Sequence, residues 1–186
     1  MPDSPAPSSS PDHHHPELAL GSSLPSISDV EHVARRGRRV VLSGTAKKLL
    51  NDSHQRLTSA MAGGAAMYGV NTGFGSLSRQ RIADKDLAEV QRNLLRSHAA
   101  GVGEPLPDET VRAMMLLLAA SLARGCSGVR PVVVETILAL LNAYVTPIVP
   151  SVGSVGASGD LAPLSHVAIV LMGEGSAHYK GENLEG

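Results

Sequence analysis

Glycine and proline divide the second half of this 186-residue chain into apolar segments with helical spacing. Apolar residues recur every three or four positions within each segment, which predicts helices with a buried face. Pro107, Asp108 and Glu109 favour a helix start, because proline suits the first turn and acidic side chains stabilise the positive end of the helix dipole. We expect helices over 84–100, 107–124, 131–144 and 161–172, followed by a short hairpin around Tyr179 and Gly181.

The first half of the chain mixes helical and extended patterns. Ser28 is predicted to cap a short helix, 38–43 has the composition of a strand, and 45–62 repeats apolar residues with helical spacing. Residues 65–70 are expected to be extended and to lead into a glycine-rich loop that ends at 75. The predicted fold class is therefore mainly α, with a small α+β part at the N-terminus.

The N-terminal segment has a composition typical of disorder. Residues 1–28 hold 6 of the 12 prolines and 8 serines, so they offer little apolar surface to offset the entropy of ordering. We expect a disordered leader over 1–27 and one folded unit over 28–186. Three consecutive histidines, 13–15, lie in the leader, and we expect no metal site there because metal ligands need a fixed geometry.

Composition excludes several classes of function. The net charge is −1 and the chain holds 1 Phe, 3 Tyr and 0 Trp, which gives nucleic acid neither a basic surface nor stacking partners. The apolar window 113–123 is too short to span a bilayer, which takes roughly 20 residues. Cys126 is the single cysteine, so no internal disulfide can form. We expect a cytoplasmic protein that binds neither nucleic acid nor membrane.

Common catalytic motifs do not fit the two glycine-rich stretches. The loop around Gly69 and Gly73 lacks the Gly-Lys-Ser/Thr of a phosphate loop. Around Ser158 the order is Gly-Ala-Ser-Gly-Asp, so the nucleophile elbow Gly-x-Ser-x-Gly fails at its fifth position. His98 and His166 have no metal-binding spacing, and no metal is expected.

The tripeptide Ala157-Ser158-Gly159 permits a different chemistry. In a tightly bent backbone, the amide nitrogen of Gly159 can attack the carbonyl carbon of Ala157, because glycine has no Cβ to block the approach. Loss of the Ser158 hydroxyl as water then leaves an exocyclic methylene. The product is a five-membered ring that carries an electrophilic alkene.

Four long stretches carry a resemblance to a known family. They are YGVNTGFGSL at 68–77, QRNLLRSHAAGVGEPL at 91–106, LARGCSGVRP at 122–131 and GSVGASGDLAPLS at 153–165. In this order they resemble the aromatic amino acid ammonia-lyase and aminomutase family, over about 28–179. The resemblance implies an ammonia-lyase-type helical bundle. It also implies that Ala157, Ser158 and Gly159 condense into the prosthetic group methylidene-imidazolone (MIO), without metal or nucleotide.

The same resemblance implies roles for four further residues. Tyr68 matches the loop tyrosine that takes the proton from the substrate's β-carbon. Asp160 matches the residue that supports cyclisation of the tripeptide, and it also suits a cap of the following helix. Asn71 and Gly75, in the loop with Tyr68, correspond to substrate-binding positions.

Ser97 and His98 correspond to the pair that selects the substrate ring. A Ser-His pair resembles the histidine lyases of the family, and an apolar pair would leave imidazole nitrogens unpaired at a cost of about 1–3 kcal/mol. The resemblance thus implies elimination of ammonia from L-histidine to give urocanate, a step of histidine degradation. A tyrosine or other aromatic aminomutase and a tyrosine or phenylalanine ammonia-lyase stay open, because some tyrosine aminomutases share Arg-Ser-His.

Members of this family continue for several hundred further residues into a helical bundle that forms a homotetramer with shared active sites. By resemblance, residues 28–186 are the N-terminal portion of such a domain, with the C-terminal bundle absent. The isolated 186-residue chain is then expected to be inactive. An alternative of another class is a truncated, non-catalytic fragment that only associates with other helices.

Overall fold

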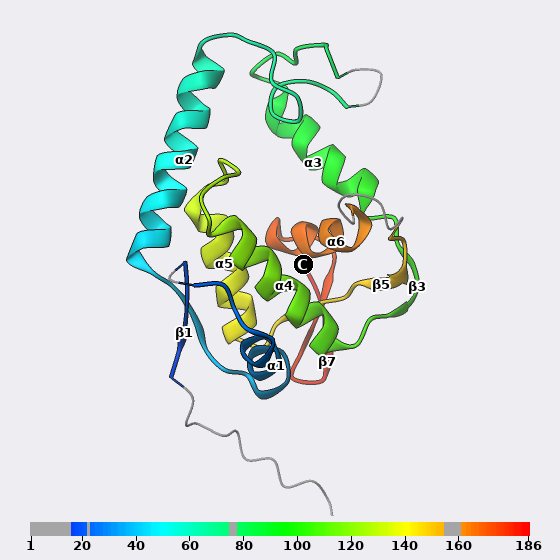
Figure 1. Cartoon of the computed structure of the whole chain (residues 1–186). Helices are drawn as coiled ribbons and strands as arrows, with labels where there is room; N and C mark the ends of the chain where they lie inside the picture. The colour runs from blue at the N-terminus through cyan, green and yellow to red at the C-terminus, as the bar shows by residue number, and fades with distance from the viewer. Residues whose placement is uncertain (1–15, 22, 75–77, 155–160) are drawn as a thin grey trace, which may run out of the picture.

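The computed structural model describes residues 16–21, 23–74, 78–154 and 161–186. Its helices connect through short strands and turns (Figure 1). The helices are α1 (Ile27–Arg36), α2 (Gly44–Ala62), α3 (Leu87–His98), α4 (Asp108–Leu122), α5 (Pro131–Asn142) and α6 (Leu161–Leu171). The strands are β1 (Leu18–Leu20), β2 (Val40–Leu42), β3 (Val102–Pro105), β4 (Thr146–Pro147), β5 (Pro150–Val152), β6 (Ser176–Tyr179) and β7 (Glu182–Glu185).

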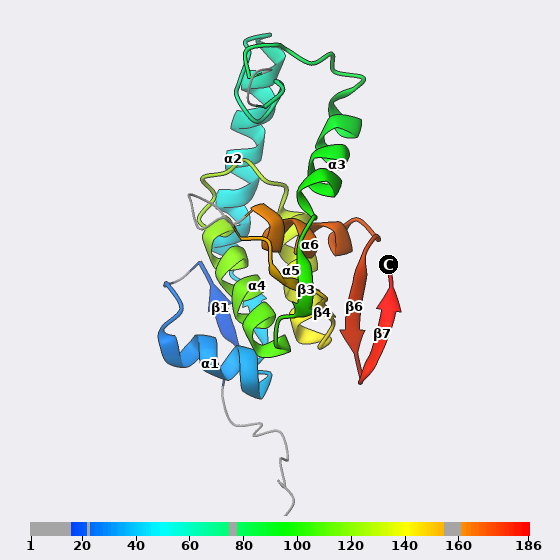
Figure 2. The same cartoon turned by 90° about the vertical axis from the view of Figure 1, so that its right-hand side faces the viewer.

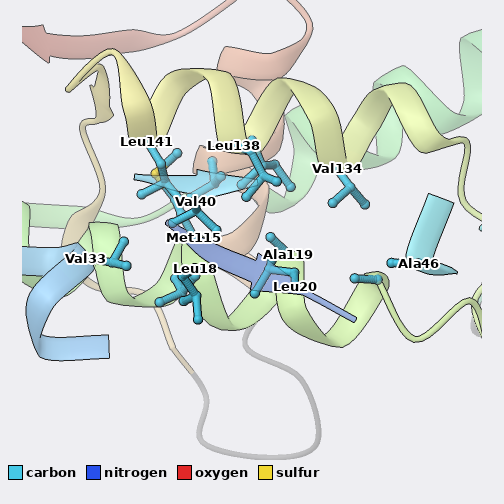
Figure 3. Packing of buried hydrophobic residues seen from close by; sticks show 14 of the residues in the cluster. Leu18, Leu20, Val33, Val40, Ala46, Met115, Ala119, Val134, Leu138 and Leu141 are labelled. Atoms are coloured by element: carbon cyan, nitrogen blue, oxygen red, sulfur yellow. The ribbon is translucent and has the colours of Figure 1, made fainter. Parts of the chain in front are cut away.

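The hydrophobic core lies around α4 and α5, which pack against each other with α1, β1 and β2 beside them (Figure 3). We call these five elements the body. Met115 and Leu116 of α4 and Ile137 of α5 are fully buried between them. The core also contains Leu18, Leu20, Val33, Val40, Val111, Ala119, Val134, Leu138 and Leu141. Burial of these side chains is the main favourable contribution to folding.

Arg112, a buried residue of α4, ties the helix ends of the body together. Its guanidinium donates hydrogen bonds to the carbonyls of Val33 (3.0 Å) and Ala34 (3.1 Å) near the end of α1, and to that of Leu141 (3.1 Å) near the end of α5. The guanidinium carbon also lies 4.8 Å from the centre of the Tyr144 ring. Burial lowers the pKa of Arg112, but carbonyls at helix C-termini and an aromatic face are favourable partners for a cation.

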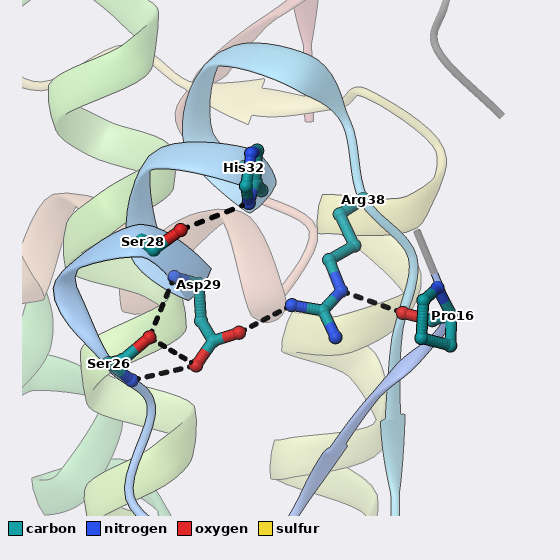
Figure 4. Close-up of polar contacts among 6 residues, drawn as sticks. All are labelled: Pro16, Ser26, Ser28, Asp29, His32 and Arg38. Atoms are coloured by element: carbon teal, nitrogen blue, oxygen red, sulfur yellow. Dashed lines mark hydrogen bonds and ion pairs between the residues drawn. The ribbon is translucent and has the colours of Figure 1, made fainter. Parts of the chain in front are cut away.

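Helix α1 begins two residues earlier than expected, with Ser26 rather than Ser28 as its N-cap (Figure 4). The Ser26 hydroxyl accepts a hydrogen bond from the backbone N–H of Asp29, and the Asp29 carboxylate accepts one from the Ser26 backbone. This capping box needs an acidic residue three positions after the cap, which Ser26 has. Arg38 then bonds both the Asp29 carboxylate and the carbonyl of Pro16.

The expectation of a disordered leader up to residue 27 is wrong for its last part. Strand β1 pairs in parallel with β2, with Leu18 opposite Val40 and Leu20 opposite Leu42. Leu18 and Leu20 are buried, so alternate leucines in an otherwise polar segment supply the apolar surface that orders it. Residues 1–15, including the three histidines, lie outside the described residues.

Residues 54–98, which we call the arm, project from the body (Figure 1). They comprise the second half of α2, a long connection and α3. Among the described residues of the arm, Asn71 and Thr72 alone are buried, and both are polar. The segment 65–70, expected to be extended, instead forms a turn in which the Val70 N–H bonds the carbonyl of Met67 at 3.1 Å. Two alanines and a glycine give this segment little to pack in a sheet.

Small antiparallel sheets complete the fold. Strand β3 pairs with β5, and β4 pairs with β6, which forms the predicted terminal hairpin with β7 (Figure 2). The mainly α class with a small α+β part is confirmed, and every predicted helix is present with ends shifted by a few residues. In the described part of the chain, no helix has the length and apolarity that a membrane span requires.

Candidate active site

The glycine-rich loop is fixed by the buried side chain of Asn71. Its Oδ1 accepts a hydrogen bond from the backbone N–H of Met67 (2.6 Å), and its Nδ2 donates to the carbonyl of Ala65 (2.9 Å). The backbone carbonyl of Asn71 accepts a further bond from the N–H of Ile82 at 2.9 Å. Asn71 was expected to bind substrate. Both polar atoms of its side-chain amide instead form hydrogen bonds with backbone groups of its own loop region. Gly75, predicted to bind substrate with it, lies outside the described residues.

Tyr68 occupies the start of the same loop. Its side chain is exposed, and its ring packs edge-on against Phe74 with the ring centres 5.7 Å apart. Gly69 adopts a φ of +75° between them, a left-handed conformation that glycine reaches at little cost. The edge-on contact orients the Tyr68 ring without covering its surface, so the phenol remains accessible to an incoming group.

Ser97 and His98 lie in the last turn of α3, and both bond the same backbone carbonyl. The Ser97 hydroxyl donates to the carbonyl of Leu94 at 2.8 Å, and Nδ1 of His98 lies 2.8 Å from that oxygen. Because a carbonyl oxygen only accepts, Nδ1 must carry the proton. In the neutral ring, Nε2 of His98 is then a hydrogen-bond acceptor.

The turn that follows this pair lies against the chain that leads to the tripeptide. The Gly101 N–H donates to Nε2 of His166, on α6, at 3.1 Å. A Cβ on Gly153 would lie 2.9 Å from the Cα of Gly101, so a side chain does not fit between these two backbones. Gly153 precedes residues 157–159 in the sequence and α6 follows them. Both sides of the predicted MIO tripeptide therefore approach the turn after Ser97 and His98.

A second link joins α3 to the region after α6. Arg96 donates two hydrogen bonds to Glu174, from Nε to Oε2 at 2.8 Å and from Nη2 to Oε1 at 2.6 Å. These bonds lower the pKa of Glu174 and raise that of Arg96. The bidentate contact fixes the relative orientation of its two partners as well as their distance.

Tyr68 stands apart from Ser97 and His98. The loop is held to the first half of α3 by Gln91, whose Nε2 lies 3.5 Å from the carbonyl of Val70, whereas the pair lies at the far end of that helix. Six residues separate Gln91 from Ser97, which corresponds to roughly 9 Å along the helix axis at 1.5 Å per residue. Among the described residues, no hydrogen bond or ring contact joins the tyrosine to the pair.

The tripeptide Ala157-Ser158-Gly159 and Asp160 lie outside the described residues, which end at 154 and resume at 161. In the part of the chain that the structure describes, no cluster of three or more His, Cys, Asp or Glu residues is arranged to hold a metal ion.

Comparison with known proteins identifies the family of this chain. Residues 26–186 match the family described as "Aromatic amino acid lyase". The chain belongs to the aromatic amino acid lyase family. Histidine ammonia-lyase of Salmonella choleraesuis is 50% identical over 157 residues, which make up 84% of this chain and 31% of the relative.

Solved structures of the family superpose on most of the chain. Ergothionase from Treponema denticola matches with a TM-score of 0.88 and 32% identity, over 91% of this chain and 34% of that protein. Tyrosine aminomutase from Streptomyces globisporus matches with a TM-score of 0.85 and 32% identity, over 91% of this chain and 32% of the aminomutase. The chain spans about a third of the length of the relatives it matches.

The structure adds residues to which the sequence pattern assigned no role. Arg96 and Gly101 lie within the stretch that resembles the family, and His166 and Glu174 lie on or after α6. The only sequence feature that could have indicated a role for Arg96 is its position directly before Ser97 and His98. Its partner, 78 positions away, is found only from the fold.

Proposed function

We propose that this chain forms the N-terminal third of a histidine ammonia-lyase, which converts L-histidine to urocanate and ammonia. The observation that carries the proposal is the packing of the Ser97–His98 turn against both flanks of the Ala-Ser-Gly tripeptide. The identity of 50% to a histidine ammonia-lyase supports it. In this proposal Ala157, Ser158 and Gly159 form MIO, which supplies an electrophilic methylene for the substrate's amine, and Asp160 supports their cyclisation.

The proposed substrate contact follows from the hydrogen-bonding state of His98. With Nδ1–H committed to the Leu94 carbonyl, Nε2 presents an acceptor to a substrate ring. An imidazole N–H satisfies that acceptor, and so does a phenol, whereas a phenyl ring leaves it unpaired at a cost of about 1–3 kcal/mol. This polarity favours histidine over phenylalanine, and tyrosine stays as the second candidate substrate.

Tyr68 is the proposed base that takes the proton from the substrate's β-carbon. Its exposed phenol and its position in the glycine-rich loop support this role. Asn71 and Gly75 are proposed to shape the substrate side of the loop, with Asn71 acting through the loop backbone that its amide holds. Ammonia departs from the α-carbon as the β-proton leaves, and the remaining carbons form the double bond of urocanate.

The proposed assembly is a homotetramer with shared active sites, in the cytoplasm. Among the described residues no hydrogen bond or ring contact joins Tyr68 to His98, which is consistent with a site that further residues complete. Helix α6 also supports assembly, because most of its residues are apolar while only Pro163, Ser165 and Val167 are buried. The single exposed Cys126 is consistent with a reducing compartment.

Replacement of Ser158 tests the proposal. We define the joined enzyme as residues 1–186 of this chain followed by the remaining two thirds of the Salmonella relative. Ser158→Ala removes the hydroxyl whose loss creates the methylene, and we expect urocanate formation, followed by ultraviolet absorbance, to fall at least 1,000-fold, about 4 kcal/mol in barrier height. Ser151→Ala, on strand β5, is the matched control and should keep its activity. Undiminished deamination by the Ser158→Ala variant would contradict the proposal.

Two further assays separate the alternatives. Product analysis with histidine and with tyrosine distinguishes a lyase, which gives an unsaturated acid, from an aminomutase, which gives a β-amino acid. The 186-residue chain alone is expected to form no urocanate, since it spans about a third of the length of the relatives it matches. Urocanate formation by that purified chain would contradict the shared site, and an inactive joined enzyme would favour the non-catalytic fragment.

A further inference from the structure

Arg96 and Glu174 connect the two elements that the proposed active site must hold in register. Arg96 immediately precedes Ser97 in the last turn of α3, and Glu174 lies three residues after the end of α6. Helix α6 in turn begins two residues after the predicted MIO tripeptide. The pair therefore connects the proposed ring-binding residues to the end of the helix that follows the tripeptide, over 78 positions of sequence.

Arg96 and Glu174 form a more specific contact than two exposed opposite charges need in order to attract each other. Both terminal oxygens of Glu174 are engaged by two different nitrogens of Arg96, at 2.8 and 2.6 Å. Such a fork fixes the plane of the guanidinium against the plane of the carboxylate, which an ammonium group cannot do. An exposed ion pair contributes little to folding stability, so its main effect here is on orientation.

A second contact makes the orientation unique. Gly101, three residues after His98, donates its backbone N–H to Nε2 of His166 on α6. Arg96 and Gly101 thus bracket the Ser97–His98 pair, and each bonds the α6 region. With one contact alone, α3 could pivot about it. Two contacts on either side of the pair hold the turn against α6.

We propose that Arg96 and Glu174 are positioning residues, whose paired contact, together with the Gly101–His166 hydrogen bond, sets the placement of His98 relative to helix α6. This inference rests on the proposed function. Neither residue touches the substrate in it; they act through the last turn of α3. A misplacement of about 1 Å at a reacting centre lowers rates by about 100-fold, so a small rotation of this turn has a large kinetic effect.

The body of the protein offers a matched control. Arg35 on α1 bonds Glu109 on α4 in the same two-pronged way, from Nε at 3.0 Å and from Nη2 at 3.3 Å, and both side chains are similarly exposed. This pair joins helices that carry none of the proposed site residues. Arg35→Lys and Arg96→Lys therefore make the same chemical change. They differ in that only Arg96 lies on the helix turn that carries Ser97 and His98.

The test uses kinetics and hydrogen exchange together. In the joined enzyme, Arg96→Lys is expected to lower kcat/KM for L-histidine by about 10- to 100-fold. Its unfolding midpoint should move by less than about 4 °C, because an exposed pair contributes little stability. Arg35→Lys should leave kcat/KM within about twofold. The charge-swapped double variant R96E/E174R should recover part of the activity that R96E loses.

Hydrogen exchange in the 186-residue chain reports the structural effect without any turnover. The Gly101 amide should exchange about tenfold faster in Arg96→Lys than in the unchanged chain, and at an unchanged rate in Arg35→Lys. If Arg96→Lys and Arg35→Lys give the same kinetics and the same Gly101 exchange, the positioning role is wrong. If the unchanged joined enzyme forms no urocanate, the proposed function fails, and the exchange experiment still decides whether the pair holds the turn.

Discussion

The body and the arm of this molecule bury different kinds of side chain. In the body, α4 and α5 contribute fully buried Met115, Leu116 and Ile137. In the described part of the arm, the buried side chains are the polar Asn71 and Thr72, and α3 has none. The body therefore supplies most of the stability of the chain, while the arm carries Tyr68, Ser97 and His98 on a scaffold held mainly by hydrogen bonds.

This division separates the hydrophobic core from the surface that carries the proposed substrate-binding pair. The two forked pairs make the contrast concrete. Arg35–Glu109 joins helices that already share a buried apolar contact, whereas Arg96–Glu174 holds a helix that has no buried side chain. The same kind of contact thus adds to a buried apolar interface in the body, whereas in the arm it acts on a helix without fully buried side chains.

Truncation of leucines gives the largest expected difference between the two regions. Leu116→Ala in the body should lower the free energy of unfolding by about 2–5 kcal/mol, because it leaves a cavity in the core. Leu94→Ala, a half-buried position on α3, should cost about 1 kcal/mol. Urea unfolding followed by circular dichroism measures both. Equal losses would show that the arm has a core of its own.

Replacement of the buried Arg112 tests how much its hydrogen bonds to the ends of α1 and α5 contribute to stability. Arg112→Met leaves three carbonyls at the ends of α1 and α5 without their donor, and should lower the free energy of unfolding by about 3 kcal/mol. Arg96→Met, with both partners exposed, should change it by about 1 kcal/mol or less. Urea titration of the two variants at one pH makes the comparison. A small effect of Arg112→Met would mean that water replaces the donor.

Substitution of His98 sharpens the functional side of the contrast. His98→Leu removes the ring acceptor, so kcat/KM for L-histidine in the joined enzyme should fall about 10- to 100-fold, equivalent to about 1–3 kcal/mol. The free energy of unfolding should hardly change, because His98 bonds only within its own helix. His54→Leu on α2, which bonds the Gly128 carbonyl away from this site, is the control. An unchanged preference for histidine over phenylalanine would exclude His98 from ring recognition.

The junction between arm and α6 should show a modest pH dependence. Burial lowers the pKa of His166 from its ordinary 6.5, so the unfolded chain binds a proton at this residue more readily than the folded chain. Stability from this residue is therefore present above pH 6.5 and declines as the pH falls below it towards the lower folded pKa. His166→Gln keeps an acceptor without titrating, and should flatten that part of the stability profile. A profile identical to that of the unchanged chain would contradict this role.

The helices could be predicted because local sequence determines their ends. Pro107, Pro131 and the paired Gly63 and Gly64 mark boundaries that the structure keeps within a few residues. Strand β2 and the terminal hairpin could also be predicted, whereas β1, β3, β4 and β5 could not, because strands of two to four residues carry no clear periodic pattern. Strand β1 exists because Leu18 and Leu20 meet a core that is assembled from residues far away in the sequence.

The candidate site divides along the same line. The sequence motif predicted that Ser97 and His98 bind substrate and that they lie near the end of a helix. The structure places both residues in the last turn of α3. The tautomer of His98 depends on the Leu94 carbonyl. The attachment of this turn to the α6 region depends on Glu174 and His166, which lie 65 or more positions from their partners. Contacts at such separations follow from the tertiary fold and leave no trace in a local pattern.

The shared use of one backbone carbonyl by Ser97 and His98 affects how this protein family can diversify. Because the hydrogen bonds of both side chains lie within their own helix, their replacement removes no hydrogen bond to another element. New pairs at these positions can therefore arise by ordinary point mutation without a destabilised intermediate that selection would remove. Under the proposed function, ring preference can therefore change in the last turn of α3 while the fold stays intact, and libraries randomised at 97 and 98 should retain a high fraction of folded members.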